Sequence, residues 1–243
     1  MERRRKMKYR KQICKIFLLT VFAAILAVIA GVAVSHLKED AKQEQLFEEI
    51  REQSEEGSDE DLLSKLKKQN SDVIGYLEIP DTTISYPVMQ TKEQPDFYLN
   101  HDFNRKYSFY GTPYLSASCD LKKSDNLIIY GHNINGGRMF GALTQYRDES
   151  FYKKYKDIFF TTESKDKYEI FAVMSVNKNV FPYWQFIMAQ DEEDYNDFIS
   201  KVKLYSIYDT GITPAYGDKL ITISTCDNIR GHDYRFVVMG VRK

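Results

Sequence analysis

The stretch Lys219-Leu-Ile-Thr-Ile-Ser-Thr-Cys226 predicts a β-strand, because aliphatic and β-branched residues fill most of it. Side chains alternate along a strand, so Ser224 and Cys226 share one face, while Ile221 and Ile223 share the other. The aliphatic face suits a protein core. Cys226 ends the more polar face, at the point where the strand gives way to a loop and a side chain can meet solvent.

Segments of the same character lie on both sides of this strand. Each is rich in β-branched or aromatic residues and is bounded by Gly, Asp, Asn or Pro. They are residues 73–79, 83–89, 126–130, 157–161, 168–176 and 234–241. Helices are predicted over 61–68, 139–146 and 191–204, the last with a buried stripe of apolar residues. We therefore expect a mostly β domain, a barrel or a sandwich, with a few peripheral helices.

The charge of the 243-residue chain is unevenly distributed, although its net value is only −1. Residues 1–15 hold eight Lys or Arg and one Glu, and residues 38–61 hold three basic and eleven acidic side chains. The remainder is neutral, which disfavours nucleic acid as a partner. A hydrophobic content of 43% excludes a wholly disordered chain, and three cysteines, whose spacing matches no zinc site, exclude a disulfide-rich scaffold.

One long apolar run, Ile-Phe-Leu-Leu-Thr-Val-Phe-Ala-Ala-Ile-Leu-Ala-Val-Ile-Ala-Gly-Val-Ala-Val-Ser, begins at Ile16. As a helix it would span roughly 30 Å, the thickness of the hydrocarbon core of a bilayer. The basic residues before it predict a cytoplasmic segment over 1–15, a signal anchor in the lipid bilayer over 16–36, and an extracellular domain. A cleaved signal peptide is the alternative, because small residues end the run, but its apolar core would be unusually long. A single run excludes a multi-span transporter.

The acidic residues 37–60 predict a spacer, either a solvated helix or a flexible stalk, between the anchor and a domain over 61–243. In that domain, two further polar side chains stand near predicted strand ends. His132 follows one strand, and Arg235 begins the last one. If the last two strands pair as a hairpin, Arg235 falls within reach of Cys226. A thiol, an imidazole and a guanidinium could then supply a nucleophile, an acid or base, and an anion stabiliser.

Several motifs resemble those of a known family. Thr222-Ile-Ser-Thr-Cys226 resembles the sortase signature Thr-Leu-x-Thr-Cys, with a His in a Gly-His-Asn context upstream and an Arg about ten positions downstream. In this chain the spacing from Cys226 to Arg235 is nine, a small departure from that pattern. Tyr98-Leu-Asn-His-Asp-Phe103, Ile129-Tyr-Gly-His-Asn-Ile134 and Gly137-Arg-Met-Phe-Gly141 resemble class B sortases in particular. The resemblance extends from about residue 60 to the carboxyl terminus, and the helix before the Cys strand also fits. Ile223 replaces the commoner Leu, a nearly volume-neutral change.

The resemblance implies a closed β-barrel and a membrane-anchored cysteine transpeptidase without a metal or other cofactor. Cys226 would cleave a carboxyl-terminal sorting signal, similar to Asn-Pro-Gln-Thr-Asn or Pro-x-Thr-Gly, after its Thr. A peptidoglycan cross-bridge or precursor amine would then resolve the thioacyl intermediate. His132 would exchange protons with the leaving and entering amines, and Arg235 would hold the substrate backbone or the oxyanion. A free thiol has a pKa of about 8.5, so a nearby cation must favour the thiolate.

Some assignments stay open on the sequence alone. Arg230 is a rival to Arg235 for the anion-stabilising role. Asp227 could orient His132 or the arginine, or could be an ordinary turn residue. Ser224 and Thr225, beside the thiol, are candidate supporting residues. His232 could border the groove, and Cys119 is expected to be a loop thiol, unpaired with the nucleophile.

Three other functions compete with wall anchoring. A pilin-polymerising transpeptidase would use a Lys side chain as the acceptor. A non-catalytic, membrane-tethered binding module would carry an inert Cys226. A metallohydrolase would need ligands from His101, Asp102, His132 and His232, but their spacing matches no familiar pattern. His101 is instead expected to be a hydrogen-bonded structural residue.

Overall fold

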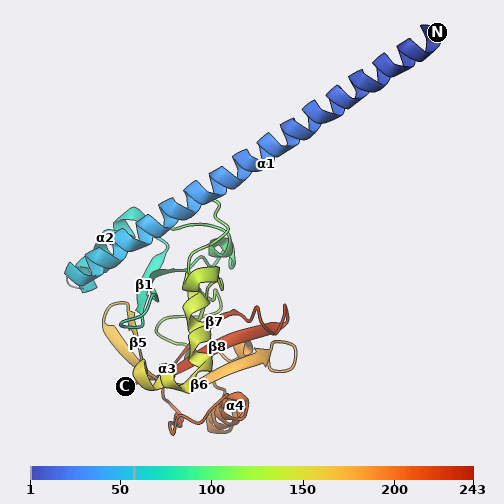
Figure 1. Ribbon diagram of the computed structural model, residues 1–243. Coiled ribbons are helices and arrows are strands. Elements are labelled where there is room, and N and C mark those ends of the chain that lie inside the picture. The colour runs from blue at the N-terminus through green and yellow to red at the C-terminus, as the bar shows by residue number, and fades with distance from the viewer. Residues whose placement is uncertain (1, 57–58) are drawn as a thin grey trace. The chain divides into compact units, whose positions relative to one another are not determined.

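The computed structural model describes residues 2–56 and 59–243 (Figure 1). The chain divides into two compact units, of which the first ends at Glu48 and the second runs from Glu49 to Lys243. The division falls inside the predicted acidic spacer. Each unit is described by itself.

The first unit lies within one helix, α1 (Glu2–Glu56), which continues without a break through the predicted anchor and into the predicted spacer. Within α1, Lys15–Ser35 is the one segment of the described residues that is long and apolar enough to cross a membrane, with a mean hydropathy of 2.8. Its side chains are exposed. The prediction of an apolar amino-terminal helix is therefore confirmed, and the spacer is helical as far as Glu56.

The second unit is a closed β-barrel, in the strand order β1-β2-β3-β4-β7-β8-β6-β5. The strands are β1 (Val73–Glu78), β2 (Ser85–Met89), β3 (Tyr114–Leu115), β4 (Asn126–Tyr130), β5 (Asp157–Thr161), β6 (Lys165–Asn177), β7 (Leu220–Cys226) and β8 (Tyr234–Arg242). The barrel confirms the predicted mostly β class and decides between barrel and sandwich. All seven predicted strands are present, and only the two-residue β3 was not predicted.

Helices surround the barrel. They are α2 (Asp59–Gln69), α3 (Glu149–Lys154), α4 (Glu192–Tyr205) and the 3₁₀ segments η1 (Phe97–Leu99), η2 (Asn135–Gly137), η3 (Phe140–Arg147) and η4 (Tyr183–Gln185). The helix predicted over 139–146 is thus the 3₁₀ segment η3, and the short α3 was not predicted.

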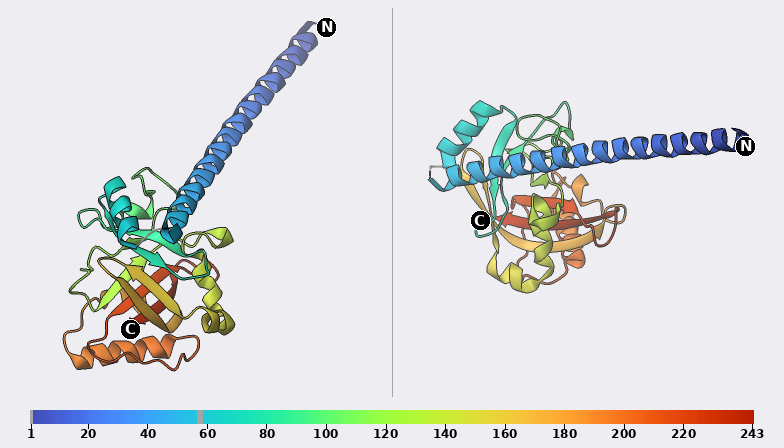
Figure 2. Two further views of the ribbon diagram at one scale, coloured as in Figure 1. Left: turned by 90° about the vertical axis from the view of Figure 1, so that its left-hand side faces the viewer. Right: turned by 45° about the horizontal axis from the view of Figure 1, so that its top comes forward.

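Helix α4 lies across the outside of the barrel (Figure 2). The Asp191 side chain caps its first turn by accepting a hydrogen bond from the Asp194 amide, 2.9 Å away. Its apolar stripe, which includes Tyr195 and Val202, is buried in one cluster with side chains of β6 and β8. The stripe therefore packs against the sheet, as its spacing predicts.

Both faces of strand β7 are buried, and only its last residue is exposed. The barrel interior covers one face, and the surrounding segments cover the other. The buried hydroxyls are paired: Thr222 Oγ1 donates to Asn126 Oδ1 at 2.8 Å, and Ser224 Oγ lies 2.5 Å from the Tyr183 hydroxyl. Only Cys226, at the end of the more polar face, is exposed, as expected for a side chain at the point where the strand gives way to a loop.

Candidate active site

The topology brings the three candidate reacting side chains to one end of the barrel. Strand β4 runs parallel to β7, so the carboxyl ends of both strands lie at that end, and His132 follows β4 by two residues. Strand β8 runs antiparallel to β7, so its first residues lie at the same end. In this ladder Cys226 is directly opposite Arg235.

Cys226, His132 and Arg235 line one open groove of about 520 Å³. The loop Ser116-Ala117-Ser118 and the residues Tyr114, Tyr130 and His232 line it too, and Ser224 and Thr225 reach its floor. Cys226 is exposed and free. Its sulfur is therefore accessible to a molecule that enters the groove, and the prediction that His232 borders this groove is confirmed.

The ring of His132 is fixed by a hydrogen bond and by a neighbouring aromatic ring. Its Nε2 lies 2.8 Å from the Leu99 carbonyl oxygen. A carbonyl only accepts, so Nε2 carries a hydrogen and Nδ1 is the nitrogen left to exchange a proton. The Phe109 ring lies nearly parallel to the imidazole, with the ring centroids 6.4 Å apart. The orientation of the imidazole is thus set before any substrate arrives.

Three hydrogen bonds tie the loop that carries His132 to the end of β7. Asn133 Nδ2 donates to the Cys226 carbonyl oxygen at 2.7 Å, and Thr225 Oγ1 donates to the Gly131 carbonyl oxygen at 2.7 Å. The Gly131 amide donates to the Ser224 carbonyl at 3.2 Å. Gly131 also has to be small, because an added Cβ would lie 2.6 Å from the Phe140 ring. The imidazole and the thiol are therefore held by the same short framework.

Ser224 and Thr225 support the site from below. Ser224 is buried against Tyr183, and burial raises the pKa of that phenol to about 12, although the Ser224 hydrogen bond partly offsets the effect. Thr225 holds the backbone of the His132 loop, as described above. Both hydroxyls are thus engaged in hydrogen bonds within the fold.

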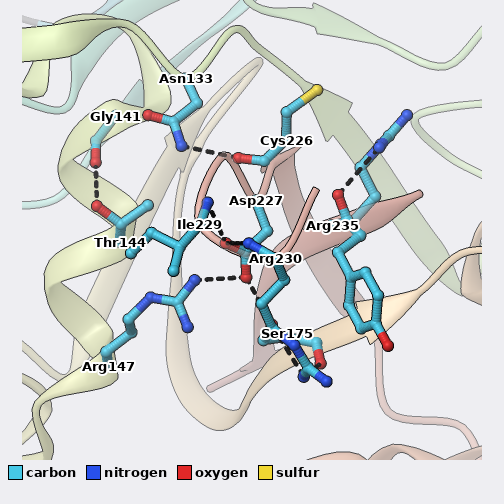
Figure 3. Close-up of polar contacts among 11 residues, drawn as sticks. Asn133, Gly141, Thr144, Arg147, Ser175, Cys226, Asp227, Ile229, Arg230 and Arg235 are labelled. Atoms are coloured by element: carbon cyan, nitrogen blue, oxygen red, sulfur yellow. Dashed lines mark hydrogen bonds and ion pairs between the residues drawn. The ribbon is translucent and has the colours of Figure 1, made fainter. Parts of the chain in front are cut away.

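The two candidate arginines lie in different places (Figure 3). One terminal nitrogen (Nη1) of Arg235 donates to the His232 carbonyl at 2.8 Å and to the Tyr234 carbonyl at 3.0 Å, and the side chain lines the groove. Arg230 instead donates to the Ser175 carbonyl at 2.9 Å, and its guanidinium lies 4.1 Å from the centroid of the Tyr234 ring. The geometry therefore favours Arg235 over Arg230 as the cation beside the sulfur.

The Asp227 carboxylate is buried on the side of the chain away from the sulfur, as Figure 3 shows. It accepts hydrogen bonds from Arg147 and from Ser175 Oγ, the latter at 2.5 Å. Burial raises the pKa of this carboxyl, but the bonds from Ser175 and Arg147, with the arginine's charge, outweigh it and bring the pKa below its ordinary value. The carboxylate thus faces Arg147 and Ser175 rather than His132 or Arg235.

The remaining candidates have structural partners. His101 Nδ1 lies 2.6 Å from the Phe97 carbonyl oxygen, and its ring stacks on that of Phe97. Cys119 is buried, and burial raises the pKa of its thiol. Within residues 2–56 and 59–243, no three His, Cys, Asp or Glu side chains are grouped to hold a metal ion. The set required by a metallohydrolase is therefore not assembled in the described part of the chain.

Sequence reasoning missed Arg147 and Ser175, the partners of Asp227. Arg147 ends η3 and Ser175 lies in β6, 80 and 52 residues from Asp227 in the chain. No local pattern marks such distant partners. The only available signal was an acidic residue directly after the candidate nucleophile, which implies a cationic or hydroxyl partner somewhere in the fold.

Comparisons with known proteins agree on one family. A family model described as the sortase domain matches residues 77–243. Sortase B of Listeria monocytogenes is 33% identical over 189 residues, which are 76% of this chain and 75% of the relative. Sortase B of Staphylococcus aureus is 30% identical over 177 residues, which are 72% of this chain and 71% of the relative. A solved S. aureus sortase B–substrate complex gives a TM-score of 0.74 at 27% identity, covering 85% of this chain and 96% of that one.

Proposed function

Because this chain belongs to the sortase family, as a class B cysteine transpeptidase, we propose that it attaches secreted proteins to peptidoglycan through a thioacyl intermediate on Cys226. One observation carries this proposal above all. Cys226, His132 and Arg235 line a single groove, and the thiol is exposed in it. Nucleophile, proton carrier and cation are the three functions that acyl transfer through a thiol requires.

In the first half-reaction the Cys226 thiolate attacks the carbonyl carbon of the Thr in a sorting signal, at the peptide bond that follows this residue. The new C–S bond pushes an electron pair onto the carbonyl oxygen, and the Arg235 guanidinium stabilises that oxyanion by charge-assisted hydrogen bonds. As the oxyanion collapses, the peptide C–N bond breaks. The imidazolium of His132 gives its Nδ1 proton to the leaving amine, because Nε2 is held by Leu99.

In the second half-reaction an amine attacks the thioacyl carbon, and neutral His132 takes its proton at Nδ1. The C–S bond then breaks and the thiolate is restored. We propose that the amine belongs to a peptidoglycan cross-bridge or to its lipid-linked precursor.

The groove suits a peptide of a few residues. Its volume of about 520 Å³ lies within the roughly 300–1,000 Å³ usual for binding pockets. The related S. aureus structure is described as a substrate complex. We propose that the donor is a secreted protein whose carboxyl-terminal signal resembles Asn-Pro-Gln-Thr-Asn or Pro-x-Thr-Gly.

We also propose that residues 16–36 anchor the enzyme in the cell membrane, with residues 1–15 in the cytoplasm and the barrel outside. The support is the exposed apolar helix Lys15–Ser35 and the basic residues that precede it. Positive charge on the cytoplasmic side of a first span sets this orientation. The enzyme would then face the wall, where its donor and acceptor meet.

The proposal is tested with the full-length protein in detergent micelles and a panel of fluorogenic peptides that carry these signals, with an added amine acceptor. Cys226→Ala is expected to abolish both cleavage and transfer. Cys119→Ala is the matched control, because that thiol is buried and does not line the groove, and the change should leave turnover within about twofold. Undiminished cleavage in the Cys226→Ala variant would contradict the proposal.

A further inference from the structure

The peptide unit that joins Cys226 to Asp227 is held from two directions. On one side, Asn133 of the His132 loop donates to its carbonyl oxygen at 2.7 Å. On the other, the Asp227 side chain is fully buried and forms an ion pair with Arg147 (Figure 3). The residue that carries the nucleophile is thus followed by a buried charge that has a specific, distant partner.

Arg147 connects this charge to the segment that carries His132. Segment η3 begins where the Phe140 amide donates to the His132 carbonyl at 2.9 Å, and it ends at Arg147. The same short element therefore contacts the residue that carries the imidazole at one end and the residue after the thiol at the other. A shift of η3 would move both.

Further contacts hold both members of the Asp227–Arg147 ion pair in place. Besides Arg147, its carboxylate accepts bonds from Ser175 Oγ and from the turn amides of Ile229 and Arg230, at 2.5, 3.2 and 3.3 Å. The Arg147 guanidinium lies over the Phe236 ring, 4.8 Å from its centroid. The Nε of Arg147 is buried without a hydrogen-bond partner among the described residues. The guanidinium therefore keeps this position although one of its possible hydrogen bonds is not formed.

We propose that Arg147 and Asp227 are positioning residues for the transfer reaction, whose ion pair fixes the Cys226–Asp227 peptide against the His132 segment. Neither side chain lines the groove, so neither contacts the substrate. The pair acts through the thiol and the imidazole, by setting their separation and direction of approach. This inference rests on the proposed function.

The test compares variants of the full-length protein in micelles at a temperature where each is folded, as judged by Trp184 fluorescence. Arg147→Met is expected to lower kcat by 10- to 100-fold and to leave KM within twofold, because misplacement of reacting groups by about 1 Å costs up to roughly 100-fold. Arg147→Lys keeps the charge and should restore kcat to within about fivefold of wild type. Arg242→Met is the matched control: it breaks an Arg–Asp pair with Asp166 at the other end of β8, and should leave kcat unchanged.

A double-variant cycle separates positioning from additive damage. Asp227→Asn and Arg147→Met are expected to lower kcat by similar factors, and the double variant by no more than the worse of the two, because one ion pair is lost in each case. Losses that multiply, or an Arg147→Met variant that keeps kcat within twofold while only its melting temperature falls, would overturn the inference. If Arg147→Met does not fold, Ser175→Ala takes its place, and its kcat is expected to drop two- to fivefold. An unchanged kcat in Ser175→Ala would also overturn the inference.

A readout without substrate distinguishes this inference from the proposed function. The rate of Cys226 alkylation by iodoacetamide, followed by peptide mass mapping, should fall at least fivefold in Arg147→Met and stay within twofold in Arg242→Met. If the wild-type protein cleaves no peptide and this difference persists, the proposed function fails while the positioning holds. If wild type is active and the alkylation rates of all variants match, the positioning fails alone.

Discussion

His132 has one ring nitrogen, Nδ1, left to exchange a proton, because Nε2 is bound to the Leu99 carbonyl. His132→Ala is therefore expected to lower kcat by about 10²- to 10⁴-fold, the usual contribution of a general acid–base group. Its melting temperature should change little, since the ring is only half-buried. Steady-state kinetics with a sorting-signal peptide check this, and retention of more than a tenth of wild-type kcat would rule out the assigned role.

Arg235 and Arg230 make a second comparison at the residue scale. Arg235→Ala is expected to cost about 2–4 kcal/mol of transition-state stabilisation, the range for one oxyanion donor. Arg230→Ala should cost less, because that side chain contacts Ser175 and Tyr234 outside the groove. The ratio of kcat/KM between variant and wild type gives both values. A larger loss in Arg230→Ala would exchange the two assignments.

Single residues also show where sequence reasoning succeeds. Cys226 and His132 lie in local motifs, and Arg235 lies nine residues after the thiol at the start of a predicted strand, so all three were predicted as candidates. The partner of Asp227 was not. An ion pair across 80 residues depends on how η3 packs under β7, and this packing has no signature in either segment.

At the scale of elements, the loop between β7 and β8 is fixed by Asp227. Because the pKa of this carboxyl is lowered in the folded state, ionisation favours folding at pH values above its ordinary pKa of about 3.9, and this contribution is lost as pH falls through the folded-state pKa. Asp227→Asn is therefore expected to lower the free energy of unfolding by about 1–3 kcal/mol at pH 7.

The pH dependence is the sharper part of that prediction. The stability gap between wild type and Asp227→Asn should be constant from about pH 8 to 5 and narrow below about pH 4. Denaturant unfolding of the full-length protein in micelles, followed by Trp184 fluorescence, measures it. Asp166→Asn is a useful comparison, since its partner Arg242 lies at the surface. A gap that widens in acid would show that Asp227 is not stabilised as a carboxylate.

Elements differ in how well the sequence indicates them. Strands such as β4 and β8 are runs of β-branched and aromatic residues, and they were predicted within a few residues. Strand β3 is two residues long and exists only because β2 and β4 flank it, so no periodicity could indicate it. The burial of both faces of β7 likewise depends on barrel closure, which the alternation of its side chains does not encode.

At the scale of the whole molecule, the choice between barrel and sandwich was open from sequence. Closure depends on which strands pair across long stretches of chain, such as β1 with β5 and β4 with β7. The family resemblance supplied this information, and the fold confirms it. The amino-terminal helix was predicted from composition alone, because membrane-spanning length and charge asymmetry are local properties.

The proposed membrane anchor gives a prediction at the scale of the whole molecule. The full-length protein should remain in the membrane fraction after an alkaline wash and retain residues 1–36, as measured by intact mass after extraction. External protease should digest the barrel in intact protoplasts. A mature protein that begins near residue 36 would instead identify the run as a cleaved signal peptide.

The most direct test of the central claim is intact-mass spectrometry of the full-length protein, acid-quenched shortly after mixing with a cleavable peptide and no amine. The account predicts a species heavier by the fragment that ends in Thr, less one water, which peptide mapping locates on Cys226. Addition of the amine should discharge it. Peptide cleavage without any such adduct, or with the adduct on another residue, would contradict acyl transfer through this thiol.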